Sequence, residues 1–178
     1  MKPTTFTKLP DVPTFTVTSA DISHDEHLGL PHLSGIFGIK GGEDKSPQLS
    51  WSGAPEGTKS YIVTVYDPDA PTQAGFWHWA VANIPADVNE LVSGAGTEAG
   101  DLLPHGAVQL PNDARMARFI GGAPPAGTGA HRYVFVVYAL DVDRIDVPAG
   151  STPTFLEFNA LSHIIGKAVI IPFAETVA

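Results

Sequence analysis

The chain has 178 residues, 18 glycines, 16 prolines, no cysteine and a formal net charge of −9. A chain of this length fits one domain that buries roughly 70% of its unfolded surface, and this much glycine and proline excludes a helical bundle. The negative charge argues against binding of nucleic acid or anionic membrane surfaces, and the lack of cysteine excludes disulfides, thiolate metal sites and a cysteine nucleophile.

The N-terminal region shows no targeting signal. Residues 1–17 lack the apolar core of a signal peptide, and the longest apolar run of the chain, residues 133–140, is much shorter than the about 20 residues that span a bilayer. We therefore expect a cytoplasmic protein with no stable membrane insertion. Residues 1–14 are rich in Thr and Pro and are predicted to be an extended arm of a single domain that comprises residues 1–178.

Short apolar stretches between Gly- and Pro-rich turns predict a series of strands. Alternating apolar and polar residues predict a half-buried strand at residues 15–19, and dense β-branched and aromatic residues predict buried strands at residues 60–66 and 76–84. Further strands are predicted at residues 48–51, 107–110, 133–140 and 167–173. We expect residues 133–140 to be the centre of the sheet, and the polar, Gly-rich residues 85–106 carry no predicted strand.

One helix is predicted, at residues 154–165. Its apolar residues recur at a spacing of 3.6 and define one face, formed by Phe155, Phe158, Leu161, Ile164 and Ile165. Thr154 and Glu157 have the spacing of a capping box at its start, and Gly166 is a stop signal at its end. The pattern as a whole predicts a mainly β, antiparallel protein with one main C-terminal helix.

A rigid acidic turn follows the strand predicted at residues 60–66. Pro68 and Pro71 fix their own φ angles and bias the residues before them toward extended conformations, so Asp67 is held on a stiff turn. His78 follows shortly after, between two tryptophans. Titratable groups on a stiff and mostly apolar platform are typical of a binding or catalytic site.

A second Pro-stiffened turn, at residues 121–129, leads into His131 and Tyr133. Two histidines near a carboxylate can bind an anion, bind a metal or transfer protons, whereas a single buried histidine more often satisfies a backbone partner. A neighbouring aspartate favours the charged imidazole, which suits a phosphate or carboxylate ligand. On the residues alone, the functional and the purely structural interpretation carry about equal weight.

Motifs for metal, nucleotide and serine-hydrolase sites are missing from the sequence. The histidines and carboxylates at residues 24–32 lack a helical pattern and an H-E-x-x-H motif, and we predict a solvated loop there. Residues 127–129 precede a strand and no lysine follows them, so they are not a phosphate-binding P-loop. No G-x-S-x-G motif is present. We expect no metal and no cofactor.

Four stretches of the chain form an ordered set. They are Ser46-Pro47-x-Leu49-Ser50-Trp51, Asp67-Pro68-Asp69-Ala70-Pro71, Phe76-Trp77-His78-Trp79 and Pro124-Pro125-x-Gly127-Thr128-Gly129-x-His131-Arg132-Tyr133. Together they resemble the signatures of the phosphatidylethanolamine-binding protein family, most closely its bacterial and archaeal branch, which is also described as Raf kinase inhibitor-like. The resemblance runs from about residue 46 to the C-terminal helix and so covers most of the chain.

The resemblance implies a β-sandwich with a small anion pocket at one end, open to solvent. Carried over by position, the residues implied to line or shape the pocket are Asp67, Pro71, Phe76, His78, Pro124, Pro125, His131 and Tyr133. Phe76 stands where other members often have a tryptophan. The resemblance also implies a cis peptide bond between Ala70 and Pro71, although only about 5–6% of X–Pro bonds in folded proteins are cis.

The leading hypothesis is a protein that binds small phosphate-bearing or other anionic ligands, with a regulatory, kinase-inhibitor-like role. The alternative is a hydrolase or lyase that uses Asp67, His78 and His131 for acid–base chemistry, and a third hypothesis is an interaction module with a vestigial pocket. The resemblance also implies a homodimer and a kinase partner. Eukaryotic members close the pocket with a C-terminal helix that bears a tyrosine, and this sequence, which ends at Ala178, contains no such segment.

Overall fold

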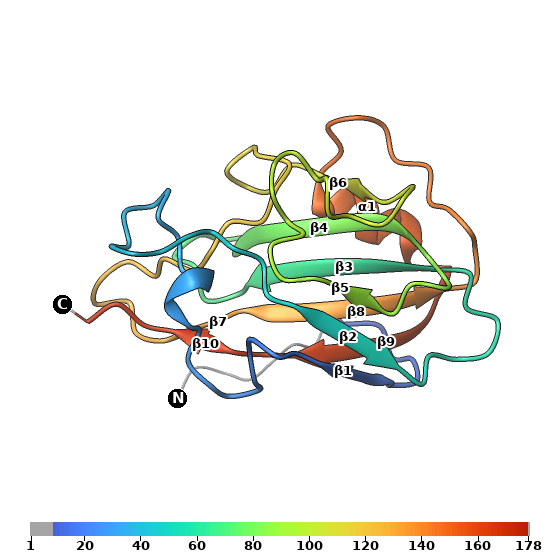
Figure 1. Ribbon diagram of the computed structural model, residues 1–178, viewed down its shortest axis with the longest axis horizontal. Helices are drawn as coiled ribbons and strands as arrows, with labels where there is room; N and C mark the ends of the chain where they lie inside the picture. Colours follow the sequence, from blue (N-terminus) through green and yellow to red (C-terminus); the bar gives the residue numbers. More distant parts are fainter. Residues whose placement is uncertain (1–8, 178) are drawn as a thin grey trace.

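Strands make up most of the regular structure in the computed structural model, which describes residues 9–177 (Figure 1). In this range the strands are β1 (Thr16–Thr18), β2 (Leu49–Ser52), β3 (Ser60–Asp67), β4 (Phe76–Pro85), β5 (Glu90–Leu91), β6 (Val108–Gln109), β7 (His131–Arg132), β8 (Val134–Leu140), β9 (Ile164–Ile170) and β10 (Phe173–Ala174). The helices are a short 3-10 helix, η1 (Leu30–His32), and one α-helix, α1 (Pro153–Ala160). The predicted mainly β protein with one main helix is confirmed, whereas residues 1–8 of the predicted arm lie outside the described residues.

Two antiparallel sheets form the sandwich, with the smaller sheet in front of the larger one in Figure 1. The larger sheet has the strand order β6-β4-β3-β8-β9, and the smaller sheet has the order β1-β2-β5. Trp51 of β2 and Leu91 of β5 pack with Val63 of β3 in the core between them. The middle strand of the larger sheet is β3, so the prediction that residues 133–140 form its centre is wrong. The reason is that β6 pairs with the outer edge of β4, so two strands lie on each side of β3.

Strand β3 is buried on both faces, which explains its unbroken apolar character. Val63 and Val65 contribute to the core between the two sheets, whereas Ile62 belongs to a second core that includes Leu156 of α1. A strand that is covered on both faces reads as a continuous apolar run rather than as an alternating one. The prediction of a buried strand at residues 60–66 is therefore confirmed.

The helix is shorter than predicted and buries a different face. It ends at Ala160, and Ile164 already belongs to β9, where it pairs with β8. Leu156 and Ala160 point into the second core, whereas Phe158 is 71% exposed. The face predicted from residues 154–165 is wrong because it combines helix residues with β-branched residues of the next strand, which are better accommodated by the sheet.

The ends of α1 also differ from the prediction. Thr152 is the N-cap, and its side chain accepts a hydrogen bond of 3.1 Å from the backbone N–H three residues later. The predicted capping box of Thr154 and Glu157 does not form, since Glu157 turns toward the sheet. Gly166 lies within β9, where a Cβ atom would come within 2.8 Å of Pro55, so close packing requires the glycine. None of the helices among residues 9–177 is long and apolar enough to cross a membrane.

The structure adds short pairings that the sequence did not predict. Strand β5 lies within residues 85–106 and pairs with β2. Strands β7 and β10 form a two-stranded ladder, and the strand predicted at residues 167–173 is divided into β9, which begins at Ile164, and β10. Segments of two residues are too short to show a periodicity, so no sequence pattern could indicate them.

The corrected helix face leads to a stability prediction. Leu156→Ala should lower the free energy of unfolding by about 2–5 kcal/mol, because it leaves a cavity under α1. Phe158→Ala, two positions along, should change it by less than about 0.5 kcal/mol, because that side chain is mostly in solvent. Urea unfolding followed by circular dichroism measures both values. A larger loss for Phe158→Ala than for Leu156→Ala would contradict the observed orientation of the helix.

Candidate functional site

A small pocket lies at the end of the larger sheet where β3 ends and β4 begins. Its volume is about 150 Å³, and its walls are mostly apolar. Strands β7 and β10 and helix η1 gather at this end of the sheet, on the left in Figure 1. The residues that line the pocket are Phe37, Asp67, Ala70, Pro71, Thr72, Phe76, His78, Ala123, Pro125, His131 and Tyr133.

The structure brings the predicted site residues together at this pocket, with one exception. Pro124 is buried and is not among the lining residues, whereas its neighbour Pro125 is. Both Pro-stiffened turns and both histidines, His78 and His131, contribute to the same small volume. Binding of a ligand by these residues stays a prediction at this stage.

Asp67 joins the acidic turn to strand β7. One carboxylate oxygen, Oδ1, accepts hydrogen bonds from the backbone N–H groups of Asp69 at 2.7 Å and Ala70 at 3.0 Å, and so closes its own turn. The other oxygen, Oδ2, lies 2.8 Å from Nδ1 of His131. The Asp67 side chain is 4% exposed and that of His131 is 1% exposed. Because a buried carboxylate is costly without a partner, the pair constrains both residues.

A second carboxylate of the same turn is held by the next residue of β7. Asp69 accepts hydrogen bonds from the backbone N–H of Arg132 at 3.0 Å and from its guanidinium at 2.8 and 2.9 Å. These hydrogen bonds are the main reason why the pKa of Arg132 is raised above its ordinary value. A two-pronged pair of this kind fixes orientation as well as distance. The acidic turn is thus attached to β7 at two successive residues.

The peptide bond between Ala70 and Pro71 is trans, which corrects the cis bond implied by the family resemblance; residues 9–177 contain no cis peptide bond. The turn closes through hydrogen bonds instead. Asp67 accepts from two backbone N–H groups, and the N–H of Thr72 donates to the carbonyl of Ala70 at 2.7 Å. With these bonds in place the turn is compatible with the trans isomer, which X–Pro bonds prefer by about 0.5–1 kcal/mol.

His131 uses both of its ring nitrogens. Nδ1 faces Asp67, and Nε2 lies 2.8 Å from the hydroxyl oxygen of Thr128. That hydroxyl also lies 2.8 Å from the backbone carbonyl of Pro125, which can only accept. When Thr128 donates to the carbonyl, its oxygen accepts from Nε2–H, and His131 then carries a proton on each nitrogen. When Thr128 instead donates to Nε2, the ring is neutral with its proton on Nδ1 toward Asp67; in both arrangements both ring nitrogens are engaged within the protein.

His78 has a different environment. Its Nδ1 lies 2.8 Å from the backbone carbonyl of Ile120 and donates to it, so in the neutral ring Nε2 is the acceptor. Burial lowers the pKa of His78, while the carbonyl of Ile120 and the charge of Asp67 act in the opposite direction to a smaller extent. His78 is therefore a neutral ring in the unliganded protein, with an acceptor nitrogen available for a ligand.

Tyr133 brings a buried hydroxyl to the pocket. The residue is 2% exposed, and its phenol oxygen forms no hydrogen bond with any residue that the structure describes. Burial raises the pKa of Tyr133 and the charge of Asp67 raises it further, while the nearby backbone N–H of Ala123 acts in the opposite direction to a smaller extent, so the hydroxyl keeps its proton and remains a neutral donor. Gly122 leaves room for the ring, because a Cβ atom there would come within 2.7 Å of it. A buried polar atom without a partner requires an explanation, and a ligand atom supplies one.

An aromatic wall continues from Tyr133 to the mouth of the pocket. The rings of Tyr133 and His78 meet edge to face at 5.0 Å, and His78 lies 4.9 Å from Phe76. Phe37 then meets Phe76 edge to face at 6.1 Å. Phe37 is 48% exposed and was not predicted, since nothing in its local sequence distinguishes it from any other loop aromatic.

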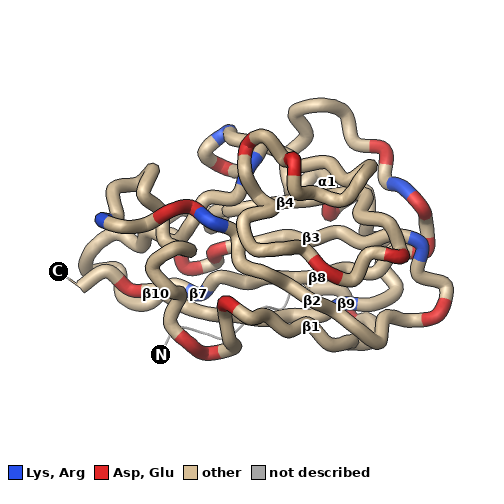
Figure 2. Tube along the Cα trace, viewed as in Figure 1, with Lys and Arg blue, Asp and Glu red and all other residues tan. Residues whose placement is uncertain are grey.

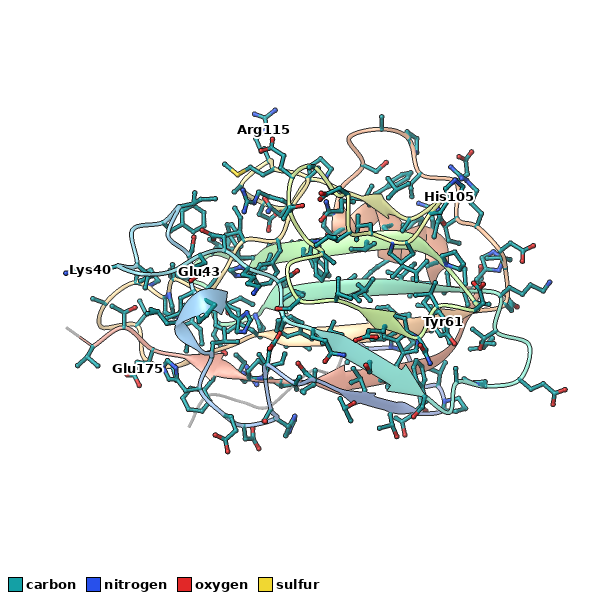
Figure 3. All side chains as sticks on the ribbon, in the orientation of Figure 1. Lys40, Glu43, Tyr61, His105, Arg115 and Glu175 are labelled. Atoms are coloured by element: carbon teal, nitrogen blue, oxygen red, sulfur yellow. The ribbon has the colours of Figure 1, made fainter. Side chains whose placement is uncertain are left out.

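The loop that carries Phe37 is attached to the pocket by Asp44. One carboxylate oxygen of Asp44 accepts from the backbone N–H of Gly121, and the other accepts from that of Ile36, both at 2.9 Å. Lys40, at the tip of this loop, points away from the molecule in Figure 3. The lining residues Ala70, Thr72 and Ala123 were not predicted although they adjoin predicted residues, whereas Phe37 and Asp44 are brought here by long-range contacts, which no local pattern indicates.

The remaining histidines do not contribute to this pocket. His24 and His27 are exposed in a loop, as predicted, but His32 is buried, and its Nδ1 lies 2.8 Å from the carbonyl of Lys45. His105 lies at the opposite end of the molecule from Lys40 (Figure 3). Within residues 9–177, no three His, Asp or Glu side chains lie close enough together to hold a metal ion.

Comparison with known proteins agrees with the motifs. The family described as "Phosphatidylethanolamine-binding protein" matches residues 18–173. The UPF0098 protein YbcL of Escherichia coli is 47% identical over 161 residues, which are 90% of this chain and 87% of YbcL. The UPF0098 protein YbhB of the same organism is 44% identical over 153 residues, 84% of this chain and 95% of YbhB. The crystal structure of E. coli YbcL, titled a new member of the mammalian PEBP family, matches with a TM-score of 0.88 at 46% identity, covering 91% of this chain and 98% of that one.

The buried ion pair leads to a prediction about stability. Asp67→Asn keeps the acceptor that closes the turn but replaces the carboxylate oxygen that faces Nδ1 of His131 with an amide N–H₂ group, so the hydrogen bond to a charged group is lost and the free energy of unfolding should fall by about 1–3 kcal/mol. A matched control is Asp141→Asn, because Asp141 also pairs with a histidine, His163, at 2.9 Å but on the surface. That change should alter stability by less than about 1 kcal/mol. Chemical denaturation of both variants checks the prediction, and equal effects would contradict it.

The free hydroxyl of Tyr133 leads to a second prediction. Tyr133→Phe should leave the free energy of unfolding unchanged within about 0.5 kcal/mol, or raise it, because no protein hydrogen bond is lost. Thermal and urea unfolding of the variant measure this directly. A loss of more than about 1 kcal/mol, typical of a broken hydrogen bond, would show that the hydroxyl has a partner in the unliganded protein.

Proposed function

The chain belongs to the phosphatidylethanolamine-binding protein family, and from this premise we propose that it is a binding protein whose pocket takes one small phosphate-bearing or other oxyanion group. The observation that best supports this function is the hydroxyl of Tyr133. It is buried and donates to no acceptor among the described residues, and it lies beside His78 and the hydrogen-bonded pair of His131 and Asp67. A donor held in this position is suited to a ligand oxygen.

The size of the pocket limits what can enter it. A volume of about 150 Å³ corresponds to about five waters at roughly 30 Å³ each, which is enough for a single oxyanion group. The rest of a phosphoester would lie outside, next to the exposed ring of Phe37. Acidic residues are spread over the surface of the molecule (Figure 2), so the attraction for an anion has to come from the pocket and not from the net charge.

The donors and acceptors of the pocket favour an oxyanion that still carries one proton. Tyr133 supplies a donor, and neutral His78 supplies an acceptor at Nε2. The monoanion of a phosphomonoester has an oxygen that can accept from Tyr133 and a P–OH group that can donate to Nε2 of His78. Sulfate lacks a proton at neutral pH and would leave the acceptor without a partner. We therefore expect phosphomonoesters to bind more tightly than sulfate.

One observation supports a hydrolase or lyase as a second candidate. Thr128, His131 and Asp67 form a continuous chain of hydroxyl, imidazole and carboxylate with 2.8 Å at each contact. This order of groups is used to activate a hydroxyl nucleophile. Turnover of aryl acetates or aryl phosphates that is lost in both Thr128→Val and Asp67→Asn would support the enzyme, whereas binding without turnover would support the leading proposal.

The biological setting is also part of the proposal. We propose a cytoplasmic protein, to be tested by cell fractionation. We also propose a regulatory role in which occupancy of the pocket alters binding to a partner such as a kinase.

We further propose a homodimer, to be tested by light scattering of the purified full chain. The interaction-module hypothesis predicts a tight partner together with an empty, non-binding pocket.

Binding of methyl phosphate tests the proposed function. In the complex one proton lies between Nε2 of His78 and a ligand oxygen, so affinity should fall as pH rises from 5.5 to 8, through the range where a phosphomonoester loses its second proton, at a pKa of about 6. Tyr133→Phe should weaken binding roughly tenfold, since a hydrogen bond to a charged group contributes about 1.5–3 kcal/mol. Isothermal titration calorimetry at the two pH values measures both effects.

The control variant is His163→Ala. In the wild type His163 also pairs with an aspartate but lies on the surface, so the variant should bind methyl phosphate like the wild type. His78→Ala should weaken binding at pH 5.5 and flatten the dependence on pH. Sulfate, titrated at pH 5.5, should bind more weakly than methyl phosphate. Equal binding by the wild type, Tyr133→Phe and His78→Ala would rule out this pocket as the site.

A further inference from the structure

A second and larger cavity lies on the other face of the sheet. Its volume is about 540 Å³, within the range of roughly 300–1,000 Å³ that is typical of ligand pockets. It lies between the sheet, helix α1 and the acidic turn. The residues that line it are Leu9, Thr64, Tyr66, Pro68, Gln73, Ala74, Trp77, Val134, Val136, Thr154 and Glu157.

The floor of this cavity is a flat apolar and aromatic surface. Thr64 and Tyr66 point to this face of β3, opposite to Val63 and Val65, and they pair in register with Val136 and Val134 of β8. Trp77 pairs with Tyr66 from the other side, and the two rings lie 4.6 Å apart. The face of such a ring pair attracts cations as well as apolar groups.

Glu157 is the only charged side chain that lines the cavity within the described part of the chain. Its Oε1 accepts hydrogen bonds from the hydroxyls of Tyr138 at 3.2 Å and Thr64 at 3.5 Å. No Lys, Arg or His of residues 9–177 forms an ion pair with it. Burial raises the pKa of Glu157 to about 7, and the two hydroxyl groups act in the opposite direction. A half-buried carboxylate that faces a cavity without a cation is poorly stabilised.

Among the residues that line the cavity, only the side-chain amide of Gln73 and the hydroxyl hydrogen of Thr154 have no acceptor within residues 9–177, and the other donors are already used. The hydroxyl of Tyr66 donates to the carbonyl of Ala74 at 2.7 Å, and the indole N–H of Trp77 donates to the hydroxyl of Thr154 at 3.1 Å. The hydroxyls of Thr64 and Tyr138 donate to Glu157. What the cavity offers a ligand is therefore a carboxylate acceptor and an apolar, aromatic surface. This combination is complementary to a donor that is positively charged.

We propose that this cavity is a binding site for a small organic ammonium ion, with the ammonium group on Glu157 and an apolar body against Tyr66 and Trp77. The site is independent of the oxyanion pocket, because Asp67 and Tyr66 alternate along β3 and point to opposite faces of the sheet. Nothing in the proposal depends on the function of that pocket.

The test compares 2-phenylethylamine with its neutral analogue 2-phenylethanol in the full chain at pH 8. An aliphatic amine is protonated there, as that of lysine is, with a pKa of about 10.4, and Glu157 is mostly ionised. The other titratable groups that face Glu157 are the phenols of Tyr66 and Tyr138, and burial raises both pKa values, so they stay neutral. Titration by NMR should show the amine binding at least tenfold more tightly than the alcohol, with shifts at the indole N–H of Trp77.

Glu157→Gln provides the decisive variant, since its amide oxygen can still accept from Tyr138 and Thr64. It should weaken amine binding at least tenfold and leave alcohol binding unchanged, whereas the exposed control Glu98→Gln should have no effect. Lowering the pH to 5.5 should weaken amine binding to the wild type but not to Glu157→Gln. If Glu157→Gln does not fold, the comparison of amine with alcohol in the wild type still decides.

Three results would overturn the proposal. One is the absence of any shift at Trp77 with either compound at millimolar concentrations. Another is equal affinity for the amine and the alcohol, or equal affinity of the wild type and Glu157→Gln for the amine. The third is a set of shifts confined to His78 and Tyr133, which would place the compound in the oxyanion pocket.

Discussion

The buried carboxylate of Asp67 is the group on which the pocket end of this molecule depends. Its Oδ1 closes the acidic turn by accepting from two backbone N–H groups, and its Oδ2 pairs with His131 of β7. A turn made stiff by Pro68 and Pro71 would otherwise be free to rotate as a rigid unit about the end of β3. The pair with His131, reinforced by Asp69 and Arg132, removes that freedom and gives the pocket a preformed shape.

Strand β3 connects the two cavities because successive side chains point to opposite faces. Asp67 lies in the oxyanion pocket, and Tyr66, the residue before it, lies in the cavity beside Glu157. The two cavities differ in chemistry: the smaller one holds the His131–Asp67 pair and the buried hydroxyl of Tyr133, and the larger one holds a carboxylate that has no cation among the described residues. The same central strand thus contributes lining residues to both cavities, on opposite faces of the sheet.

The two histidines of the motifs look equivalent in the sequence but have different roles in the structure. His131 is paired with a carboxylate and has both nitrogens engaged within the protein, so it offers no free nitrogen to a ligand. His78 donates to a backbone carbonyl and is kept neutral by burial, so it contributes an acceptor. The difference comes from one neighbour of each ring, Asp67 in the first case and Ile120 in the second. Tyr133 then supplies the donor among these three side chains that has no acceptor within the described residues.

Local sequence by itself determined the long strands and the stiff turns, because β-branched runs, alternation and proline act over a few residues. The pocket residues, in contrast, were implied by the resemblance to the family, and all of them except Pro124 line the small pocket. Only the tertiary structure decided where α1 ends, that Phe37 reaches the pocket, and which nitrogen of each histidine is engaged. The apolar periodicity predicts that Ile164 continues the helix, whereas in the structure it is a strand residue that pairs with β8. Such outcomes depend on contacts between distant segments, whose free energies exceed local propensity.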